Sequence, residues 1–337
     1  MSAALATLPA ALPGLILSAY AAAPALDSWH RADEATYLAA AASLPHVAGL
    51  ELPFYGRGLH RYDSGWFLEA VRHLPPHLAF TVTTIPDTMH CLRGQQGFGL
   101  ASLDDEGRRA GLAAVFRADE AVRSLNDILG RRAVTSVHLF SAPRPAAGAP
   151  AGTSAQASAG ALGASLAELA GYAWDGARPV LEHCDAGTGS GPWIKGFLPV
   201  EAEIDAILAA DAGVGLAVNW ARSVIEQRDV SAPVRHLKLA GDAGVLAGAV
   251  LSGCSPVDTR FGRAWDDTHL PPARLEPDSL LTADRVAEFT RAAGAEMPGG
   301  RGCLYRGLKV SAPRGATVEQ RLVILSGSIA AVREAGF

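Results

Sequence analysis

Two ionisable side chains interrupt stretches of sequence that are otherwise apolar. Glu182 ends the run Pro-Val-Leu-Glu, and Lys309 stands between leucine and valine in Gly-Leu-Lys-Val-Ser. A charge inside a protein is costly unless it is paired, so each of these residues needs a partner or a function. A carboxylate can move a proton while a nearby ammonium group stabilises negative charge on a substrate oxygen. We expect such chemistry here, with a purely structural salt bridge as the alternative.

Three further polar side chains stand in the same kind of position. Glu51 in Gly-Leu-Glu-Leu-Pro, His138 in Ser-Val-His-Leu-Phe and Asn219 in Ala-Val-Asn-Trp each interrupt or end an apolar run. Each alone is typical of a hydrogen-bonded core group, but their shared position indicates a pocket suited to proton transfer. We expect Glu182 to be the general base, with its pKa raised by burial, and Glu51 or His138 to be its acid–base partner. Lys309 and Asn219 are expected to stabilise the oxyanion.

Seven residues at or after the ends of apolar runs are candidate substrate contacts: Tyr20, Asp185, Trp193, Trp220, Arg222, Trp265 and His269. The motif Trp-Asp-Asp-Thr-His, which begins at Trp265, combines an aromatic platform with polar ligands as sugar-binding loops do, although a helix cap explains its aspartates equally well. Arg222 suits a carboxylate or phosphate, and equally a surface ion pair. Asp185 is either a loop cap or a site group. His183 is predicted to face the opposite side of its strand from Glu182.

Apolar, strand-like runs alternate with amphipathic helical stretches along the chain. The predicted strands are residues 15–20, 47–54, 78–85, 134–140, 179–184, 214–219, 246–252 and 305–311. The predicted helices are residues 32–43, 66–73, 104–129, 159–173, 199–210, 234–240, 282–293 and 318–335. Eight strand–helix units in this order predict an α/β fold, a single closed parallel (β/α)8 barrel over residues 1–337. The alternative, an open doubly wound sheet, usually begins with a glycine-rich phosphate turn, which the first run lacks.

Long segments without a regular pattern follow several of the predicted strands. Residues 57–62, 88–102, 187–197 and 254–277 are expected to be loops, and the Ala-, Gly-, Pro- and Ser-rich segment 142–161 a flexible insert. Strand-to-helix loops of a barrel all lie on one face, so this face is elaborated and should carry the site. Trp193 and Lys195 lie in one of these loops, where they are placed to cover the pocket.

Composition restricts the class of protein. The chain has 337 residues, 49% of them hydrophobic and 19% charged, which indicates a globular protein with a large core. A net charge of −5 gives no indication of the positive surface that binding to nucleic acid or to an anionic membrane requires. The four cysteines are widely spaced and are expected to be reduced thiols. The uncharged N-terminal stretch lacks a basic start and is interrupted by proline, so we expect a cytoplasmic protein without a signal peptide or membrane anchor.

The glutamate that ends the fifth predicted strand, the eight βα units and the strand-end polar residues resemble the xylose isomerase-like barrel superfamily. This group contains sugar isomerases, ketose 3-epimerases and sugar-phosphate isomerase- or epimerase-like proteins. The resemblance implies a divalent metal held by Glu, Asp, His and Glu from strands five to eight. By strand order, Glu182 matches the first ligand, whereas Asn219, Ser252 and Lys309 stand at the other three positions. Since an ammonium group repels a cation, we expect no metal at this position, and we expect the positive charge of Lys309 to take its place. No other cofactor is expected.

The resemblance and the residues together predict a metal-independent isomerase or epimerase that abstracts a proton next to a carbonyl. Its expected partner is a small carbohydrate substrate, not nucleic acid or a membrane, and a homo-oligomer remains open. One alternative is a glycoside hydrolase or lyase that uses Glu51 and Glu182 as a carboxylate pair. Others are a non-catalytic sugar-binding protein on a degenerate enzyme barrel and a Schiff-base aldolase that uses Lys309.

Overall fold

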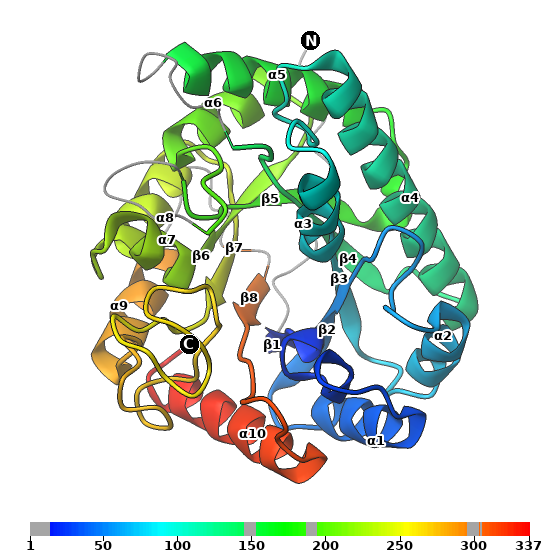
Figure 1. Cartoon of the computed structure of the whole chain (residues 1–337), viewed down its shortest axis with the longest axis vertical. Coiled ribbons are helices and arrows are strands. Elements are labelled where there is room, and N and C mark those ends of the chain that lie inside the picture. Colours follow the sequence, from blue (N-terminus) through cyan, green and yellow to red (C-terminus); the bar gives the residue numbers. More distant parts are fainter. Residues whose placement is uncertain (1–13, 145–152, 187–193, 295–302, 304) are drawn as a thin grey trace.

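Eight parallel strands form a closed barrel at the centre of the molecule. The computed structural model describes residues 14–144, 153–186, 194–294, 303 and 305–337. The strands are β1 (Leu15–Leu17), β2 (Val47–Pro53), β3 (Ala79–Thr83), β4 (Val134–Leu139), β5 (Arg178–Glu182), β6 (Gly215–Asn219), β7 (Leu246–Leu251) and β8 (Tyr305–Leu308). Each strand pairs with the next in chain order, and β8 pairs with β1 (Figure 1). The predicted (β/α)8 barrel is confirmed.

Helices surround the barrel on its outside (Figure 1). They are α1 (Arg31–Ala42), α2 (Ser64–Arg72), α3 (Ile85–Gly94), α4 (Asp105–Leu129), α5 (Thr153–Leu169), α6 (Val200–Ala210), α7 (Trp220–Gln227), α8 (Ala232–Asp242), α9 (Ala283–Gly294) and α10 (Val318–Glu334). The described part of the chain also contains the short 3-10 helices η1 (Ala19–Ala22), η2 (Pro24–Leu26) and η3 (Trp174–Gly176). Within the described ranges, none of the helices combines the length and apolar character that a membrane crossing requires.

The alternation of side chains along the strands explains why polar residues meet inside the barrel. Successive residues of a strand point to opposite faces. One set of strand residues packs against the helices in the main hydrophobic core, as Leu181 of β5 and Leu216 of β6 do. The other set forms a small separate cluster of apolar side chains, made up of Ile16, Ala79, Val180, Ala217, Ala247, Val250 and Tyr305. Further toward the C-terminal ends of the strands, the same inner face carries Glu182 on β5, Asn219 on β6 and Lys309 after β8.

Two helices were not predicted, and both begin close to the end of a strand. The helix α3 occupies much of the segment 88–102, which was expected to be a loop. It has a proline in its first turn, a position where the missing N–H carries no cost. The helix α7 follows β6 with no linker, and the side chain of Asn219 caps it by accepting the N–H of Arg222 at 3.4 Å. Because no polar linker separates β6 from α7, the sequence pattern does not show where the strand ends and the helix begins.

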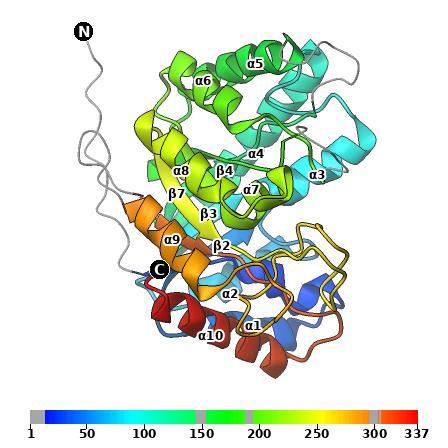
Figure 2. The ribbon, with the colours of Figure 1, turned by 90° about the vertical axis from the view of Figure 1, so that its left-hand side faces the viewer.

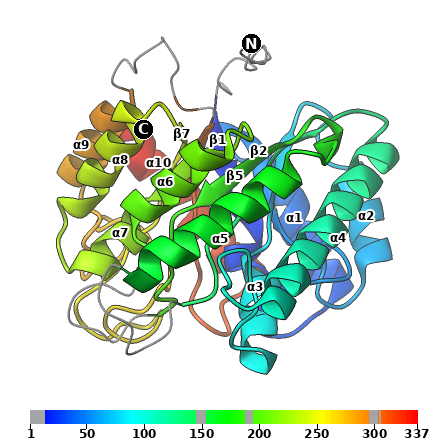
Figure 3. The ribbon, with the colours of Figure 1, turned by 90° about the horizontal axis from the view of Figure 1, so that it is seen from above.

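The expectation of a flexible insert over residues 142–161 is wrong for its second half. Residues 145–152 lie outside the described residues, but α5 begins at Thr153 and continues to Leu169. Alanine is the strongest helix former, so an alanine-rich segment forms a helix even where glycine and serine are frequent. The helix α5 packs beside α6 on the outside of the barrel, as Figures 2 and 3 show.

The Gly160→Ala substitution tests whether this segment is helical. Gly160 is exposed within α5, and no atom lies within 4 Å of the Cβ that an alanine would add. In a helix, alanine should raise the free energy of unfolding by about 0.5–1 kcal/mol, measured by urea denaturation. Gly49→Ala is the matched control, because its new Cβ would lie 2.3 Å from the carbonyl oxygen of Ala79 and should destabilise the protein. An unchanged stability in Gly160→Ala would contradict the helix.

Candidate active site

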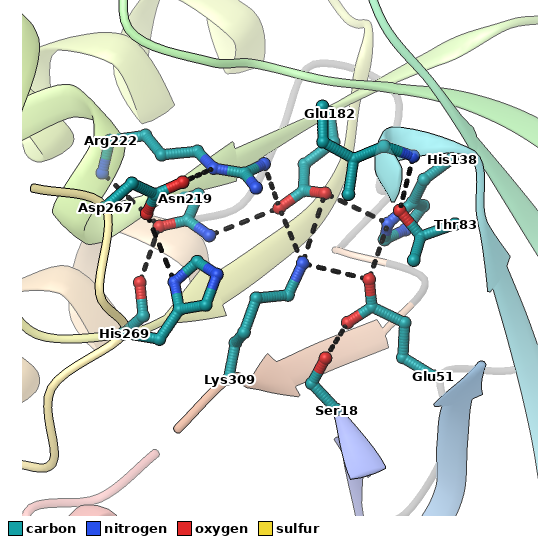
Figure 4. A network of polar contacts seen from close by, with 12 residues as sticks. Ser18, Glu51, Thr83, His138, Glu182, Asn219, Arg222, Asp267, His269 and Lys309 are labelled. Atoms are coloured by element: carbon teal, nitrogen blue, oxygen red, sulfur yellow. Dashed lines mark hydrogen bonds and ion pairs between the residues drawn. The ribbon is translucent and has the colours of Figure 1, made fainter. Parts of the chain in front are cut away.

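An ammonium group lies between two carboxylates where the strands end. Lys309 Nζ is 2.9 Å from Glu51 Oε1, and 3.4 and 3.5 Å from the two carboxylate oxygens of Glu182 (Figure 4). Lys309 and Glu182 are completely buried, and Glu51 is 4% exposed. The hydroxyl of Ser18 donates a hydrogen bond to the other oxygen of Glu51. The predicted meeting of Glu182 and Lys309 is therefore present, and Glu51 belongs to it.

His138 on β4 bridges the same two carboxylates. Its Nδ1 lies 3.3 Å from Glu182 Oε2 and 3.7 Å from Glu51 Oε1, and its Nε2 contacts the hydroxyl of Tyr305. Burial lowers the pKa of His138, but Glu182 and Glu51 outweigh this effect and raise the pKa above its ordinary value. A protonated imidazole beside two carboxylates is a proton donor.

A second charged group adjoins the first through Arg222. This residue, on α7, places Nη1 2.8 Å from Glu182 Oε1 and Nε 3.1 Å from Asp267 Oδ2. Asp267 also contacts Lys195 Nζ and lies 3.1 Å from His269 Nδ1. Arg222 was predicted as a substrate contact or a surface ion pair, yet it is 1% exposed. The aspartate that holds it was explained equally well as a helix cap, because nothing in the sequence links these distant segments.

The expected rise in the pKa of Glu182 is wrong. Burial does raise the pKa, but the charges of Arg222 and Lys309 outweigh it and hold the pKa of Glu182 well below its ordinary value. Burial likewise raises the pKa of Glu51, but the charge of Lys309 and the contact with His138 outweigh burial and lower this pKa to about 2. The two carboxylates in turn raise the pKa of Lys309 against the effect of burial. All three groups are therefore ionised.

The low pKa of Glu51 predicts a loss of stability in acid. A carboxylate whose pKa falls from 4.5 to about 2 on folding stabilises the protein above pH 4.5. This contribution is lost as the pH falls toward about 2, when Lys309 and His138 lose their anionic partner. The free energy of unfolding, measured with urea across this range, should decline less steeply in Glu51→Gln than in the wild type. Equal slopes would contradict the assignment.

The four strand-end positions do not offer the ligands of a divalent metal. Asn219 Nδ2 donates to Glu182 Oε1 at 3.2 Å, and Ser252 Oγ donates to Asn219 Oδ1 at 2.9 Å. Glu182 thus supplies the sole carboxylate of this set, while the ammonium of Lys309 lies in contact with it. Divalent cations such as Mg²⁺ or Mn²⁺ bind several oxygens, often anionic, and a fixed ammonium group repels them. Glu51, His138 and Glu182 are close enough to share an ion, but Lys309 already contacts both carboxylates.

Two of the predicted substrate contacts lie beside this network. The ring of Tyr20, in η1, has its centroid 5.7 Å from Lys309 Nζ, within reach of a cation–π interaction. His269 is 14% exposed, and Asp267 holds its Nδ1. Burial lowers the pKa of His269 and, together with smaller contributions from the charges of Lys309 and Arg222, outweighs Asp267, which raises the pKa. A neutral imidazole in this position can accept a proton.

The other predicted contacts have different surroundings. Asp185 Oδ2 accepts the backbone N–H groups of residues 194, 195 and 196, so it is the loop cap of the two alternatives. The prediction for Trp220 is wrong, because its indole is 1% exposed and packs in the main hydrophobic core. Trp265 stacks under the guanidinium of Arg228, 4.4 Å from the ring centroid. Trp193 lies outside the described residues.

Comparison with known proteins places the chain in a family. Residues 16–324 match the model of a domain of unknown function, DUF4862. The chain belongs to this family. The uncharacterized protein STM3670 of Salmonella typhimurium strain LT2 is 35% identical over 323 residues, which are 96% of this chain and 97% of that protein.

Solved structures with the same fold are more distant in sequence. A putative xylose isomerase from Rhodospirillum rubrum aligns with a TM-score of 0.63 at 13% identity, over 96% of this chain and 99% of its own. The 3-keto-D-glucoside 4-epimerase YcjR of E. coli aligns with a TM-score of 0.56 at 13% identity, over the same shares of the two chains. The fold is that of the xylose isomerase-like barrels, as the sequence predicted.

Proposed function

We propose that this member of the DUF4862 family is an isomerase or epimerase that acts on a small sugar or sugar derivative without a catalytic metal. The observation that carries the proposal is the ammonium of Lys309 between Glu51 and Glu182 at the C-terminal mouth of the barrel. Active sites of (β/α)8 enzymes lie at this face. The names of the two structural neighbours, a putative xylose isomerase and a keto-glucoside epimerase, support a sugar as the class of substrate.

In the proposed reaction, the positive charges activate a substrate carbonyl. When the carbonyl oxygen enters, Lys309 and Arg222 are shared between it and Glu182. The two cations then stabilise the ionised form of Glu182 less strongly, so the pKa of Glu182 rises. This rise occurs when the substrate carbon next to the carbonyl loses its proton. The electron pair of the broken C–H bond forms a carbon–carbon double bond while the π pair of the carbonyl moves to the oxygen. The resulting enediolate is stabilised by Lys309 and by the imidazolium of His138. An isomerisation is complete when Glu182 returns the proton to the former carbonyl carbon and the neighbouring hydroxyl proton passes to the former carbonyl oxygen, which leaves the new carbonyl on the adjacent carbon.

An epimerisation needs a second proton-transfer group on the opposite face of the substrate. His269 meets this need, because it is neutral, partly exposed and oriented by Asp267 at 3.1 Å. The carboxylate orients the ring through Nδ1 and leaves Nε2 for the substrate. We therefore assign Glu182 and His269 to the two faces.

The ion pairs argue against two of the alternative functions. A glycoside hydrolase of the usual kind needs one carboxyl group that is protonated, whereas Glu51 and Glu182 share one ammonium and both have a lowered pKa. A Schiff base needs a neutral amine, whereas the pKa of Lys309 is raised.

The test is a screen for hydrogen exchange. Aldoses, ketoses and keto-glucosides are incubated with the protein in D₂O, and NMR follows deuterium incorporation next to the carbonyl. We expect exchange and a new isomer for at least one sugar. Binding of a sugar without exchange would identify a sugar-binding protein, and release of a free sugar from a glycoside would identify a hydrolase. Either result would overturn the proposal.

A further inference from the structure

A second buried cluster lies on the other side of β5. His183 follows Glu182 and faces away from the barrel interior, as predicted. Its Nδ1 lies 2.7 Å from Glu203 Oε2 on α6, and its Nε2 lies 2.8 Å from Glu226 Oε2 on α7. None of the three residues is more than 5% exposed. The proposed reaction uses none of them.

His236 on α8 completes this cluster. Its ring stands almost perpendicular to that of His183, with the centroids 5.0 Å apart. Its Nδ1 is 3.0 Å from the hydroxyl oxygen of Ser223, and its Nε2 faces the side-chain amide of Gln227. One ligand atom from each of His183, Glu226 and His236 lies within 4.8 Å of the other two.

We propose that His183, Glu226 and His236 bind a divalent transition-metal ion, for which Zn²⁺ is the best match. Two imidazoles and one carboxylate are a ligand set of zinc, with a fourth position left for water or a neighbouring polar group. Bonds of about 2 Å place tetrahedral ligands about 3.3 Å apart. The ligand atoms lie 2.8 to 4.8 Å apart, so each pair needs to move by at most about 1.5 Å to reach this spacing. The site lies between the barrel and its helices, apart from the network around Lys309.

The surrounding residues orient both imidazoles for this role. Glu203 accepts the proton on Nδ1 of His183, which directs Nε2 toward Glu226. The hydroxyl of Ser223 accepts the proton on Nδ1 of His236, which leaves Nε2 of that ring as the ligand atom. Metal-binding histidines are commonly held in this way, by a carboxylate or another acceptor on the far nitrogen.

Charge also favours an ion at this position. His183 contacts a carboxylate through each ring nitrogen, so in the absence of metal one protonated imidazole faces two buried carboxylates, Glu203 and Glu226. A divalent ion with two neutral imidazoles would balance these two negative charges. On binding, the metal displaces the proton on Nε2 of His183 to solvent, and the amide of Gln227 moves away from His236.

The position suggests what the ion would hold together. The strand β5 carries Glu182 on one face and His183 on the other, and α7 carries both Arg222 and Glu226. An ion bound by His183 and Glu226 would therefore hold β5 and α7 together. These two elements carry Glu182 and Arg222, which form an ion pair at 2.8 Å in the barrel. This inference stands independently of the proposed function.

Metal analysis of the full chain tests the site. The protein, without a histidine tag, is loaded with Zn²⁺, dialysed and analysed by mass spectrometry for bound metal, and by X-ray absorption for its ligands. We expect one zinc ion per chain with two imidazole ligands. His236→Gln and Glu226→Gln should lose the ion, whereas the matched control Glu182→Gln should keep it.

The ligand count separates this site from the barrel. The cluster of Glu51, His138 and Glu182 contains a single imidazole, so the absorption spectrum of the wild type decides between the two even if a variant fails to fold. No retained zinc would overturn the inference and leave the proposed function intact. A single-imidazole spectrum with zinc lost in Glu182→Gln would overturn both.

Discussion

Replacing Lys309 with methionine is expected to lower turnover about 100- to 1000-fold, the usual effect of removing one group that stabilises an oxyanion. Methionine preserves much of the volume but removes the charge that contacts Glu51 and Glu182. The same change leaves two buried carboxylates without their shared cation, which should reduce the free energy of unfolding by about 3–5 kcal/mol. Deuterium exchange measures the first effect, and urea denaturation the second.

A double variant separates the two roles of this lysine. Adding Glu51→Gln to Lys309→Met removes one of the unpaired charges and should recover part of the stability without recovering turnover. Lys238 on α8 is exposed, so Lys238→Met serves as the matched control and should change neither quantity. Full turnover in Lys309→Met would show that the ammonium is not part of the chemistry.

Replacing Glu182 with glutamine is expected to lower turnover about 100- to 10,000-fold, since a positioned base contributes this much to proton transfer. Glutamine retains the size of the side chain and an oxygen that can accept from Asn219 and Arg222, so the fold should persist. Exchange of the substrate hydrogen into D₂O should slow by the same factor as product formation.

The control for this substitution is a second buried glutamate. Glu34 is 5% exposed and pairs with His60 at 3.1 Å, outside the network around Lys309. Glu34→Gln should therefore affect stability and leave turnover unchanged. If both variants lose turnover equally, the loss in Glu182→Gln reflects damage to the fold rather than removal of the base.

The barrel and the centre of its site could be predicted because both follow from local patterns. Apolar runs of strand length that alternate with helices predict the fold. A charged residue in such a run, as at Glu182 or Lys309, must have a buried partner. The two-residue period of a strand then predicts which side chains face inward, and it correctly predicted that His183 faces outward.

The remainder of the site depends on contacts between distant segments. Arg222 and Asp267 are separated by 45 residues, and no local pattern in the sequence connects them. The pKa of Glu182 could not be predicted for the same reason, because burial and two cations oppose one another and only their distances decide the outcome. Trp220 was misplaced because the helix α7 begins at this residue without a linker.

The central claim is that the ammonium of Lys309 replaces a metal ion at the mouth of the barrel. The most direct test measures deuterium exchange before and after treatment with a chelator, and after addition of Mn²⁺ or Mg²⁺. The test uses the His236→Gln variant, so that a metal ion bound by His183, Glu226 and His236 cannot affect the measured rate. We predict that the rate stays the same in all three conditions and that Lys309→Met lowers it about 100- to 1000-fold. Loss of exchange with the chelator, and its recovery with a divalent cation, would contradict the claim.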